Sequence, residues 1–464
     1  MKPFSILLVN CIDTASEVQT RYPSLGLGHL AASARQAFGK EVCMRIADRL
    51  PPEILRADPP NLVGLSSVSQ NYGIAVKYAA ASKAAGIPVL MGGPHISQLP
   101  RTLSADMDLA AIGEAENTFV ELVRRLMDHG GRFHAEDLAK IPGVAFRDGD
   151  GFIETPLPSP IGFKTGSLDE IPAPARDLLR VDRHTNMFTS RGCPYKCLFC
   201  ASTRYWPALR FFSAAHVAEE IRTLVERHDV KHITFHDDLF LANLPRLREL
   251  ADLLDGNGVL KKGIRFSCSA SVTTIGEETA ELLKRMNVVT VAMGLESGND
   301  GILKYLKGDA FSVEKNASAV RTLNARGIHA HGSFVIGSPP ETRETIMDTH
   351  RFIRDMPLSI VNIYVLTPLP GTPVWEMAER AGLVSNGMDW SRLRIDFQRN
   401  WRQAVLLPGN LSREELYGLY RKLRSLRARK MLKSIWTHPF LREVPRYALR
   451  SAKQILTHRL KHQK

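Results

Sequence analysis

The sequence predicts an α/β protein in three parts: a Rossmann-like doubly wound parallel sheet, a partial (β/α)6 barrel and a basic helical end. Two runs of short apolar segments alternate with helical segments, which is typical of parallel sheets. A proline-rich stretch separates the two runs. We therefore expect a Rossmann-like domain over residues 1–150, a linker over 151–185, a barrel over 186–385 and a helical region with a basic tail over 386–464.

Five short apolar segments in the first run predict buried strands, because each ends at small or polar residues and is too short for a helix. Helical patterns lie between them, one opening at Gly26–Ala32 after Pro23 and Ser24, and another over 72–85. In such a sheet a ligand lies at the carboxyl ends of the strands. The predicted strands are 6–10, 42–48, 62–66, 89–92 and 109–112.

The second run has six predicted strands, again separated by helical segments such as 214–227 and 313–325. Gly327 follows the second of these helices as a stop signal. Six strand–helix units fit a partial barrel, in which chemistry belongs at the carboxyl ends of the strands. The predicted strands are 186–189, 232–236, 264–269, 290–295, 330–336 and 360–366.

Three cysteines follow the first strand of this barrel. Cys193, Cys197 and Cys200 have the spacing C-x3-C-x2-C in a chain with only six cysteines. Three thiolates hold three corners of a [4Fe-4S] cluster and leave one iron open, whereas a cluster ligated by protein alone needs four. Zinc is the competing metal, but no second ligand pair stands nearby to complete a tetrahedron. Separate buried thiols are the structural alternative.

This motif resembles that of the radical S-adenosylmethionine (SAM) superfamily, with Phe199 as the aromatic residue before the third cysteine. The resemblance implies that SAM chelates the open iron and is cleaved to methionine and a 5′-deoxyadenosyl radical, which abstracts hydrogen from an unactivated carbon. It also implies an external electron donor of the flavodoxin or ferredoxin type.

Further residues at the predicted strand ends resemble the SAM-binding positions of this superfamily. Asp237 and Asp238 stand where the family holds the amino group of SAM, and carboxylates accept hydrogen bonds from an ammonium group; helix capping is the alternative for each. Glu296, within Gly-Leu-Glu-Ser-Gly, is expected to bind the ribose hydroxyls, and Phe199 and Ser333 are the remaining expected SAM contacts. The segment Val335–Thr342 resembles the one that packs along adenine, but for Glu341 we expect a structural role as a dipole partner at the start of a helix.

Turns after three strands of the first sheet carry small residues, which let the backbone approach a large ligand closely. With the Pro-x-Leu-Gly-type opening at Pro23–Gly26, these turns resemble the cobalamin-binding domain that precedes the barrel in one large class of radical SAM proteins. A general need for small residues at parallel strand ends is the alternative. The expected cobalamin contacts are Ser66, Gly92, Gly93, Gly113 and Glu114.

The Asp-x-His-x-x-Gly motif, which supplies a lower axial histidine in other cobalamin proteins, is absent from the chain. We therefore expect cobalamin to bind base-off without a histidine ligand. His95 is expected to be a wall or hydrogen-bonding residue.

The segment Thr367–Pro373 resembles one in the group that includes the anaerobic Mg-protoporphyrin ester cyclase, the hopanoid methylases and the phosphinate methylases. The resemblance implies a radical SAM enzyme that uses cobalamin to transfer a methyl group to an unactivated carbon of a small molecule. Cyclisation, ring contraction or oxidation with the same cofactors is the alternative. RNA methylthiotransfer is disfavoured, because that family has three N-terminal cysteines where this chain has only Cys11 and Cys43. A non-catalytic iron–sulfur protein would favour four cysteine ligands.

The net charge of +13 is concentrated at one end of the chain: residues 421–464 contain fourteen Lys and Arg and one acid, Glu443. Ser412 and Glu415 predict the start of a helix there, and a basic helix with an apolar stripe and Trp436 can lie on an anionic membrane. A packed or solvated helix is the alternative, and nucleic-acid contact is the least expected. Without a membrane-spanning stretch or a secretory leader, we expect a cytoplasmic protein, with membrane-peripheral contact and a lipophilic substrate as a hypothesis.

Overall fold

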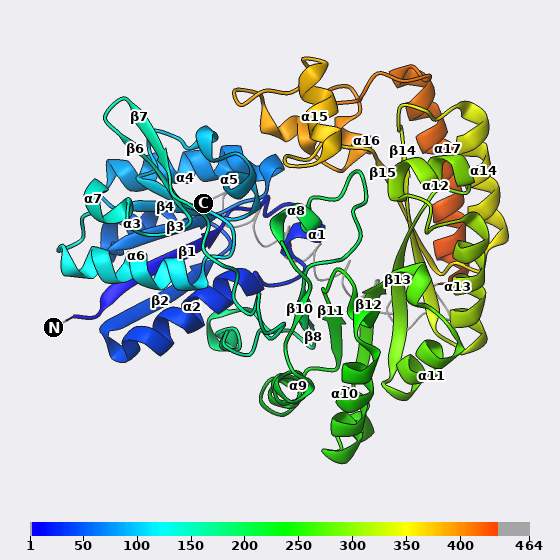
Figure 1. The fold of residues 1–464 in the computed structure, drawn as a ribbon, viewed down its shortest axis with the longest axis horizontal. Coiled ribbons are helices and arrows are strands. Elements are labelled where there is room, and N and C mark those ends of the chain that lie inside the picture. Colours follow the sequence, from blue (N-terminus) through cyan, green and yellow to red (C-terminus); the bar gives the residue numbers. More distant parts are fainter. Residues whose placement is uncertain (1, 435–464) are drawn as a thin grey trace, which may run out of the picture. The chain divides into compact units, whose positions relative to one another are not determined.

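The computed structural model describes residues 2–434, and Figure 1 draws its ribbon. The chain forms two compact units. Among the described residues, unit 1 comprises the chain up to Arg265 together with Leu366–Pro408, and unit 2 comprises Phe266–Val365 and the residues from Gly409 to Ser434. Within the described residues, no helix is long and apolar enough to cross a membrane.

The first sheet of unit 1 has seven strands in the order β2-β1-β3-β4-β5-β6-β7. As predicted, β1 to β5 are parallel, whereas β6 and β7 add an antiparallel hairpin at one edge. The interior strand β1 is buried along most of its length, as expected of a parallel strand covered on both faces. The strands are β1 (Phe4–Asn10), β2 (Val42–Ala47), β3 (Leu62–Ser66), β4 (Val89–Gly92), β5 (Leu109–Ala111), β6 (Val144–Asp148) and β7 (Gly151–Glu154).

Helices cover this sheet (Figure 1). The helices α2 and α6 contact each other and share one apolar core with the sheet, to which Leu27 and Phe119 contribute. The helices are α1 (Glu17–Thr20), α2 (Leu25–Phe38), α3 (Pro52–Ala57), α4 (Tyr72–Ala84), α5 (Pro94–Gln98), α6 (Glu116–Asp128) and α7 (Ala135–Leu138).

The hairpin of β6 and β7 was not predicted, and β7 lies within the stretch that we expected to be a linker. Its turn contains Gly149, whose φ of +54° favours glycine. Gly149 and Asp150 connect the two strands, and Gly-Asp between strands is a hairpin signal that the neighbouring prolines obscured. The later part of the same stretch packs on α2, because a Cβ at Gly28 would lie 2.8 Å from Leu179 and 3.0 Å from Pro174.

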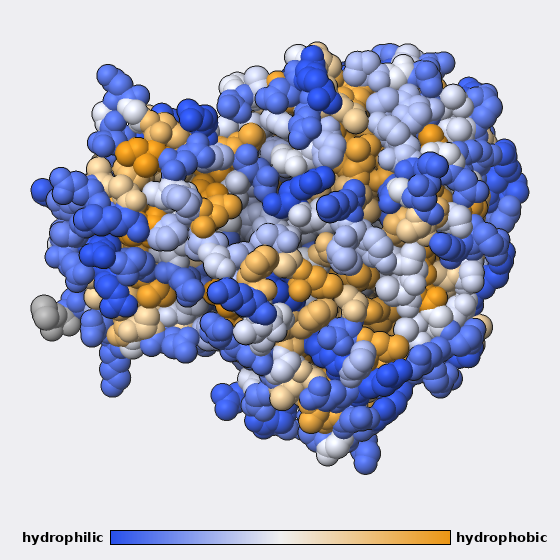
Figure 2. Space-filling model, viewed as in Figure 1, coloured by the Kyte–Doolittle hydropathy of each residue, from blue (hydrophilic) through white to orange (hydrophobic). Residues whose placement is uncertain are grey.

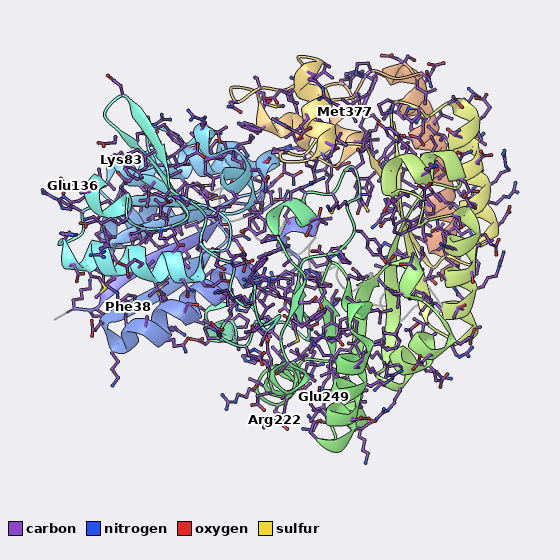
Figure 3. All side chains as sticks on the ribbon, in the orientation of Figure 1. Phe38, Lys83, Glu136, Arg222, Glu249 and Met377 are labelled. Atoms are coloured by element: carbon purple, nitrogen blue, oxygen red, sulfur yellow. The ribbon has the colours of Figure 1, made fainter. Side chains whose placement is uncertain are left out.

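The rest of unit 1 contains the first two strands of the second run, β8 and β11, which pair in parallel, and a short antiparallel hairpin of β9 and β10. The helices α9 and α10 pack together. Arg222 on α9, labelled in Figure 3, forms ion pairs with Glu219 and Glu226 at 2.6 and 3.0 Å. The elements are β8 (His184–Met187), β9 (Ser190–Arg191), β10 (Arg210–Phe211), β11 (His232–Phe235), α8 (Ser202–Tyr205), α9 (Ala214–His228), α10 (Leu244–Gly256), α15 (Pro373–Arg380) and α16 (Phe397–Asn400).

Unit 2 continues the run with four parallel strands, each paired with the next in chain order. Six parallel strands, two in unit 1 and four that follow, therefore alternate with helices, which confirms the predicted (β/α)6 arrangement. The elements are β12 (Arg265–Ala270), β13 (Val288–Glu296), β14 (His329–Ile336), β15 (Ile360–Val365), α11 (Glu277–Arg285), α12 (Asp300–Lys307), α13 (Val313–Ala325), α14 (Arg343–Asp355) and α17 (Arg413–Ser434).

The last described helix, α17, begins with the predicted cap: Ser412 N donates to Glu415 Oε2 at 2.9 Å, and Glu415 N donates to Ser412 Oγ at 3.3 Å. Its residues Leu416 and Leu423 are buried where the helix packs against β15 and α14. Figure 2 shows the surface over α14 as mainly hydrophilic. The start of the basic region is thus a packed helix, whereas Trp436 and most of the expected membrane-contact residues lie outside the described residues.

Candidate active site

The three cysteines lie on the loop that leaves β9 and returns to β10. Cys193, Cys197 and Cys200 are half-buried, and Cys200 N donates to Cys197 O at 3.2 Å, which closes a tight turn. Three thiolates on one accessible loop fit a [4Fe-4S] cluster with one open iron. Within residues 2–434, no group of three or more Cys, His, Asp or Glu side chains is arranged to hold a single metal ion. An iron–sulfur cluster does not need such an arrangement, because each thiolate binds a different iron.

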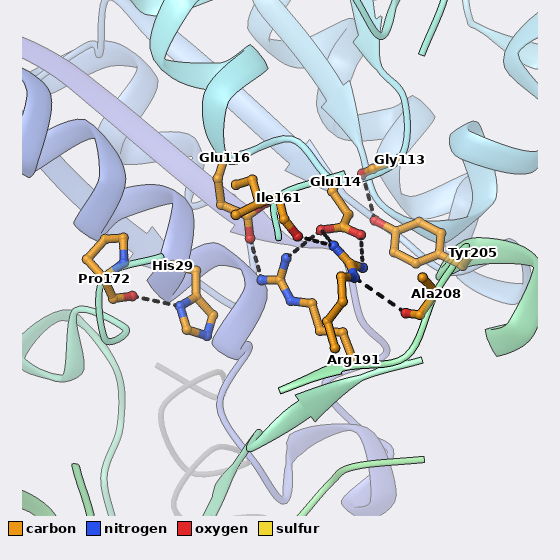
Figure 4. A network of polar contacts seen from close by, with 10 residues as sticks. His29, Gly113, Glu114, Glu116, Ile161, Pro172, Arg191, Tyr205 and Ala208 are labelled. Carbon is orange, nitrogen blue, oxygen red and sulfur yellow. Dashed lines mark hydrogen bonds and ion pairs between the residues drawn. The ribbon is translucent and has the colours of Figure 1, made fainter. Parts of the chain in front are cut away.

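Two arginines, one at each end of this loop, share one carboxylate (Figure 4). Arg191 on β9 and Arg210 on β10 are paired across the hairpin. Both arginines bind Glu114: Nη1 of Arg191 and Nη1 of Arg210 lie 3.1 and 3.0 Å from its Oε2, and Nη2 of Arg210 binds its Oε1. Nη2 of Arg191 also binds Glu116. None of these four side chains is more than 8% exposed. Two carboxylates thus neutralise two guanidinium groups in a buried site.

These ion pairs contribute to the pKa values of Glu116 and His29. Burial is the largest single influence on Glu116 and acts to raise its pKa, but the charge and hydrogen bond of Arg191, together with the charge of His29 and a backbone hydrogen bond, lower this pKa overall. Burial and then the charge of Arg191 lower the pKa of His29 to about 4, so this imidazole is neutral at pH 7. Both oxygens of Glu114 are bound by arginines, and its expected contact with cobalamin stays a prediction.

The adjacent aspartates after β11 have different environments. Asp237 is 2% exposed; its Oδ1 accepts hydrogen bonds from Thr189 N and Ser190 N at 2.6 and 3.2 Å, and its Oδ2 accepts one from the Thr189 hydroxyl. Burial raises the pKa of Asp237 despite these hydrogen bonds. Asp238 is exposed and accepts a hydrogen bond from the Ser202 hydroxyl on α8. Asp237 therefore holds the backbone that leads into the cysteine loop, and Asp238 is the carboxylate accessible to an ammonium group.

Glu296, at the end of β13, is buried in a strained backbone conformation. Its φ of +55° is uncommon for a residue with a Cβ atom, and such strain concentrates at functional sites. Burial raises the pKa of Glu296 to about 7, which the charge of Lys307, with Nζ 3.9 Å from Oε1, partly opposes. Ser333, within β14, pairs with Gly294, so the two expected SAM residues of unit 2 lie on neighbouring strands.

Glu341 lies in the turn before α14 and is fully buried. It accepts a hydrogen bond from Ser338 N at 2.9 Å, and burial raises its pKa to about 7. A carboxylate that holds its own turn in this way has the structural role that we expected.

The strand ends of the first sheet form a half-buried surface. Because β3, β4 and β5 are neighbours, the turns at their carboxyl ends lie side by side, and Ser66 pairs with Gly92. Gly93 has a φ of +90°, and a Cβ there would lie 2.6 Å from Ser66 Oγ, so the protein itself requires this glycine. A Cβ at Gly92 or Gly113 would meet no atom closer than 3.9 and 3.8 Å, respectively, so neighbouring protein atoms leave space there.

The position and chemistry of this surface fit a large ligand. The strand order 2-1-3-4-5 has its switch point between β1 and β3, where ligands bind in such sheets. The hydroxyl of Ser67, directly after β3, is buried and has no hydrogen-bond partner among the described residues. A strand-end surface with uncovered glycines and an unsatisfied hydroxyl fits cobalamin, which is large and carries polar groups.

His95 is completely buried near this surface. Its Nδ1 lies 3.0 Å from Ser69 Oγ, and its Nε2 lies 3.0 Å from Thr102 Oγ1. Burial lowers the pKa of His95 to about 3. With both ring nitrogens engaged, His95 is the hydrogen-bonding residue that we predicted.

A polar face on β14 and β15 was not predicted. Asn362 Nδ2 lies 3.0 Å from His331 Nε2 and 3.2 Å from Tyr364 Oη. These half-buried side chains alternate along the strands with buried apolar ones, and Asn362 pairs with Ser333, so the polar residues share one face with an expected SAM residue. The alternation His-Ala-His-Gly-Ser over 329–333 was the sequence signal for this face.

A second polar group, in unit 1, was also missed. Tyr22 Oη lies 2.9 Å from His184 Nε2 and 3.2 Å from Thr234 Oγ1. Burial lowers the pKa of His184 to about 2, so this histidine is a neutral hydrogen-bonding group. The contact joins the segment before α2 to β8 and β11, more than 160 residues away in the sequence, and no local pattern predicts it.

Two family models match the chain. The model described as the B12 binding domain matches residues 13–123, which contain the strand ends described above. The model described as the radical SAM superfamily matches residues 187–353, which contain the three cysteines, Asp238 and Glu296.

Individual proteins are similar over most of the chain. The uncharacterized methyltransferase PH0819 of Pyrococcus horikoshii is 30% identical over 463 residues, which cover 94% of this chain and 96% of that protein. The cytidylyl-2-hydroxyethylphosphonate methyltransferase of Streptomyces wedmorensis is 24% identical, with 88% and 86% covered. The solved structure of the radical SAM methyltransferase TsrM from Kitasatospora setae, with cobalamin and a [4Fe-4S] cluster bound, has a TM-score of 0.70 at 19% identity and covers 91% of this chain and 89% of TsrM. This last similarity shows a shared fold.

Proposed function

The chain belongs to the B12-binding class of the radical SAM superfamily, and on this premise we propose that it methylates an unactivated carbon of a small molecule. Its cofactors are a [4Fe-4S] cluster, SAM and cobalamin. The observation that carries the proposal is that unit 1 contains both a loop with three half-buried cysteines and a strand-end surface where neighbouring protein atoms leave space beside Gly92 and Gly113. The methyltransferase that is similar over 94% of the chain favours methyl transfer over cyclisation.

The chain's own residues would hold the cluster and SAM as follows. The thiolates of Cys193, Cys197 and Cys200 would ligate three irons. The exposed carboxylate of Asp238 would accept hydrogen bonds from the amino group of SAM, and Glu296 would accept them from the ribose hydroxyls. Ser333 and Phe199, the other expected SAM contacts, would position the rest of SAM.

Cobalamin would be held at the strand ends by Ser66, Gly92, Gly93 and Gly113. The glycines let the backbone approach the corrin, and the Ser67 hydroxyl offers a hydrogen bond that no described residue uses. When bound, the cluster with SAM supplies a radical that takes hydrogen from carbon, and cobalamin supplies the methyl carrier.

The substrate is proposed to contact the polar face of β14 and β15. His331, Asn362 and Tyr364 offer hydrogen-bonding groups beside Ser333, so we propose a small molecule with polar groups near the reacting carbon. A flavodoxin-type or ferredoxin-type protein would supply the electrons. The expected contact of the basic tail with a membrane, and with it a lipophilic substrate, is a further proposal, which liposome flotation of the full chain against a chain ending at residue 420 would test.

Product analysis tests the proposed reaction. Anaerobically reconstituted protein with SAM, hydroxocobalamin and a reductant should form both 5′-deoxyadenosine and S-adenosylhomocysteine during turnover of its substrate. Cys197→Ala should form no 5′-deoxyadenosine and no methylated product, because it lacks the radical step. 5′-Deoxyadenosine without S-adenosylhomocysteine would instead support cyclisation or oxidation, and a protein that binds no hydroxocobalamin would contradict the assignment of the strand-end surface.

A further inference from the structure

The loop that carries the three cysteines is attached at both ends to one residue of the first sheet's domain. Arg191 directly precedes this loop, residues 192–209, and Arg210 directly follows it; the two arginines face each other across the hairpin. Both bind Glu114, which follows Gly113 at the end of β5. One carboxylate of the B12-binding domain therefore holds both feet of the loop (Figure 4).

Further contacts strengthen this attachment. Tyr205, within the loop, donates a hydrogen bond from its hydroxyl to Gly113 O at 2.9 Å. The guanidinium of Arg191 lies over the ring of Trp206, 5.0 Å from its centre. Arg210 also donates to Ile161 O at 2.5 Å. The turn after β5 thus contacts the residues at both ends of the loop and one residue in its returning half.

The hairpin restricts the backbone between Arg191 and Cys193. Gly192, between Arg191 and Cys193, has a φ of +92°, and a Cβ there would overlap Ala208 O on the returning side of the loop. Only glycine fits this close approach. Arg191 and Gly192, the two residues between Glu114 and Cys193, therefore have tightly restricted positions.

The burial and charge balance of these arginines and carboxylates also set them apart from an ordinary surface ion pair. Two arginines and two carboxylates balance in charge, and all are nearly inaccessible to solvent. Buried ion pairs are weak contributors to stability, but removing one partner leaves an uncompensated buried charge, so the geometry is strongly specified.

We propose that Glu114, Arg191 and Arg210 form a carboxylate clamp that positions the cysteine loop and couples it to the occupancy of the strand-end surface of β3–β5. Gly113 is next to Glu114 and is one of the proposed cobalamin contacts, so a ligand there biases the position of the clamp. By linkage, order in the loop must in turn affect affinity at the strand ends. The identity of the two cofactors rests on the proposed function, whereas the clamp rests on the contacts above.

Hydrogen–deuterium exchange of the full chain, followed in peptides from residues 192–209, tests the clamp. In the cluster-loaded parent protein, hydroxocobalamin should slow exchange in this loop by about tenfold, within the range typical of coupled sites. Glu114→Gln should speed exchange of the loop about tenfold without ligand, and should abolish the effect of hydroxocobalamin.

Glu220→Gln is the matched control. Glu220 pairs with Arg176 in unit 1 at 2.6 Å, both side chains are 7% exposed, and their hydrogen bonds do not involve the cysteine loop. This variant should change exchange of residues 192–209 by less than about twofold and should keep the hydroxocobalamin effect. Arg191→Lys keeps the positive charge but loses the forked geometry of the guanidinium group, so its loop exchange rate should lie between those of the parent and Glu114→Gln. This variant replaces Glu114→Gln in the test if Glu114→Gln does not fold.

Equal loop exchange in the Glu114 and Glu220 variants, or a hydroxocobalamin effect that survives Glu114→Gln, would overturn the proposal. Failure of the proposed function is distinguishable, because visible absorption then shows no bound hydroxocobalamin in the parent. The ligand-free comparison of Glu114→Gln with Glu220→Gln still tests the positioning role of the clamp in that case.

Discussion

Lys307 and Glu296 form a buried ion pair at the end of β13, with Nζ 3.9 Å from Oε1 and each side chain 8% exposed. Burial raises the pKa of Glu296 to about 7, and the charge of Lys307 opposes that rise. Lys307 also donates a hydrogen bond to Gly294 O at 2.6 Å, which fixes its ammonium group beside the strand end. The charge of Glu296 therefore changes near neutral pH.

SAM affinity should rise as the pH increases through about 7, because the deprotonated form of Glu296 accepts hydrogen bonds at both oxygens. Lys307→Met should move the midpoint to higher pH by removing the opposing charge, and Glu296→Gln should abolish this transition. Equilibrium dialysis of SAM with cluster-loaded protein, between about pH 5.5 and 8.5, measures the midpoint. An unchanged midpoint in Lys307→Met would contradict the role of this ion pair.

The same pKa shift predicts how folding stability depends on pH. The folded protein holds the proton of Glu296 more tightly than the unfolded chain, whose value is 4.5, so this stabilisation is present below about pH 4.5 and lost as the pH rises through about 7. Glu296→Gln does not titrate, so from pH 4.5 to 8 its free energy of unfolding should gain about 3 kcal/mol relative to the parent. Urea unfolding at both pH values measures this difference, and parallel curves would refute the shift.

Asp237 and Asp238 should respond differently to alanine. Asp237→Ala leaves three buried donors on Thr189 and Ser190 without their acceptor and should cost about 2–4 kcal/mol of unfolding free energy, with loss of iron. Asp238→Ala removes an exposed carboxylate, so it should cost less than about 0.5 kcal/mol and keep the iron while weakening SAM binding. Denaturant unfolding, iron content and SAM dialysis together compare the two. Equal stability of both variants would show that Asp237 is not the structural member.

Alanine substitutions at Gly92 and Gly93 should separate an effect on ligand affinity from an effect on folding stability. Gly93→Ala places a Cβ at a φ of +90° and 2.6 Å from Ser66 Oγ, so it should destabilise the fold by about 2 kcal/mol or more. Gly92→Ala meets no atom closer than 3.9 Å, so the fold should tolerate it, while the methyl group should lower hydroxocobalamin affinity. Thermal unfolding and a hydroxocobalamin titration measure both effects. Unchanged affinity in Gly92→Ala would place the corrin elsewhere.

Cys197→Ala should remove the cluster, because two thiolates are too few to retain a cluster that already relies on three. Iron and sulfide content after anaerobic reconstitution should fall several-fold, and SAM cleavage should stop. Cys43→Ala is the control, since Cys43 is exposed on β2. A Cys197→Ala protein that still cleaved SAM would overturn the assignment of the cluster ligands.

Most strands were predictable from the sequence. Buried parallel strands such as β1, β3 and β4 are short continuous apolar runs that end at small residues, and the structure has them where these runs lie. The hairpin of β6 and β7 was missed, because its strands are short and prolines follow directly. Hydrophobic pattern identifies an element only where it persists over several residues.

The candidate site was predictable only in part. The spacing of Cys193, Cys197 and Cys200 needs no tertiary information, since all three lie on one loop. Asp237 and Asp238 are indistinguishable by sequence, and the difference between a buried and an exposed carboxylate arises from the hydrogen bonds of Asp237 with Thr189 and Ser190. The clamp was missed for a related reason: Arg191 and Glu114 are 77 residues apart, and one sequence carries no record of that pairing.

By itself, the sequence determined the two runs of parallel strands and the cysteine loop, because apolar periodicity and ligand spacing are local properties of the chain. Only the tertiary structure decided which carboxylates are buried, which glycines leave open space, and that Arg191 and Arg210 hold the loop through Glu114. The physical reason is that desolvation, ion pairing and steric space depend on residues brought together by folding. These interactions determine the pKa of Glu296 and the position of the loop, and no local pattern contains them.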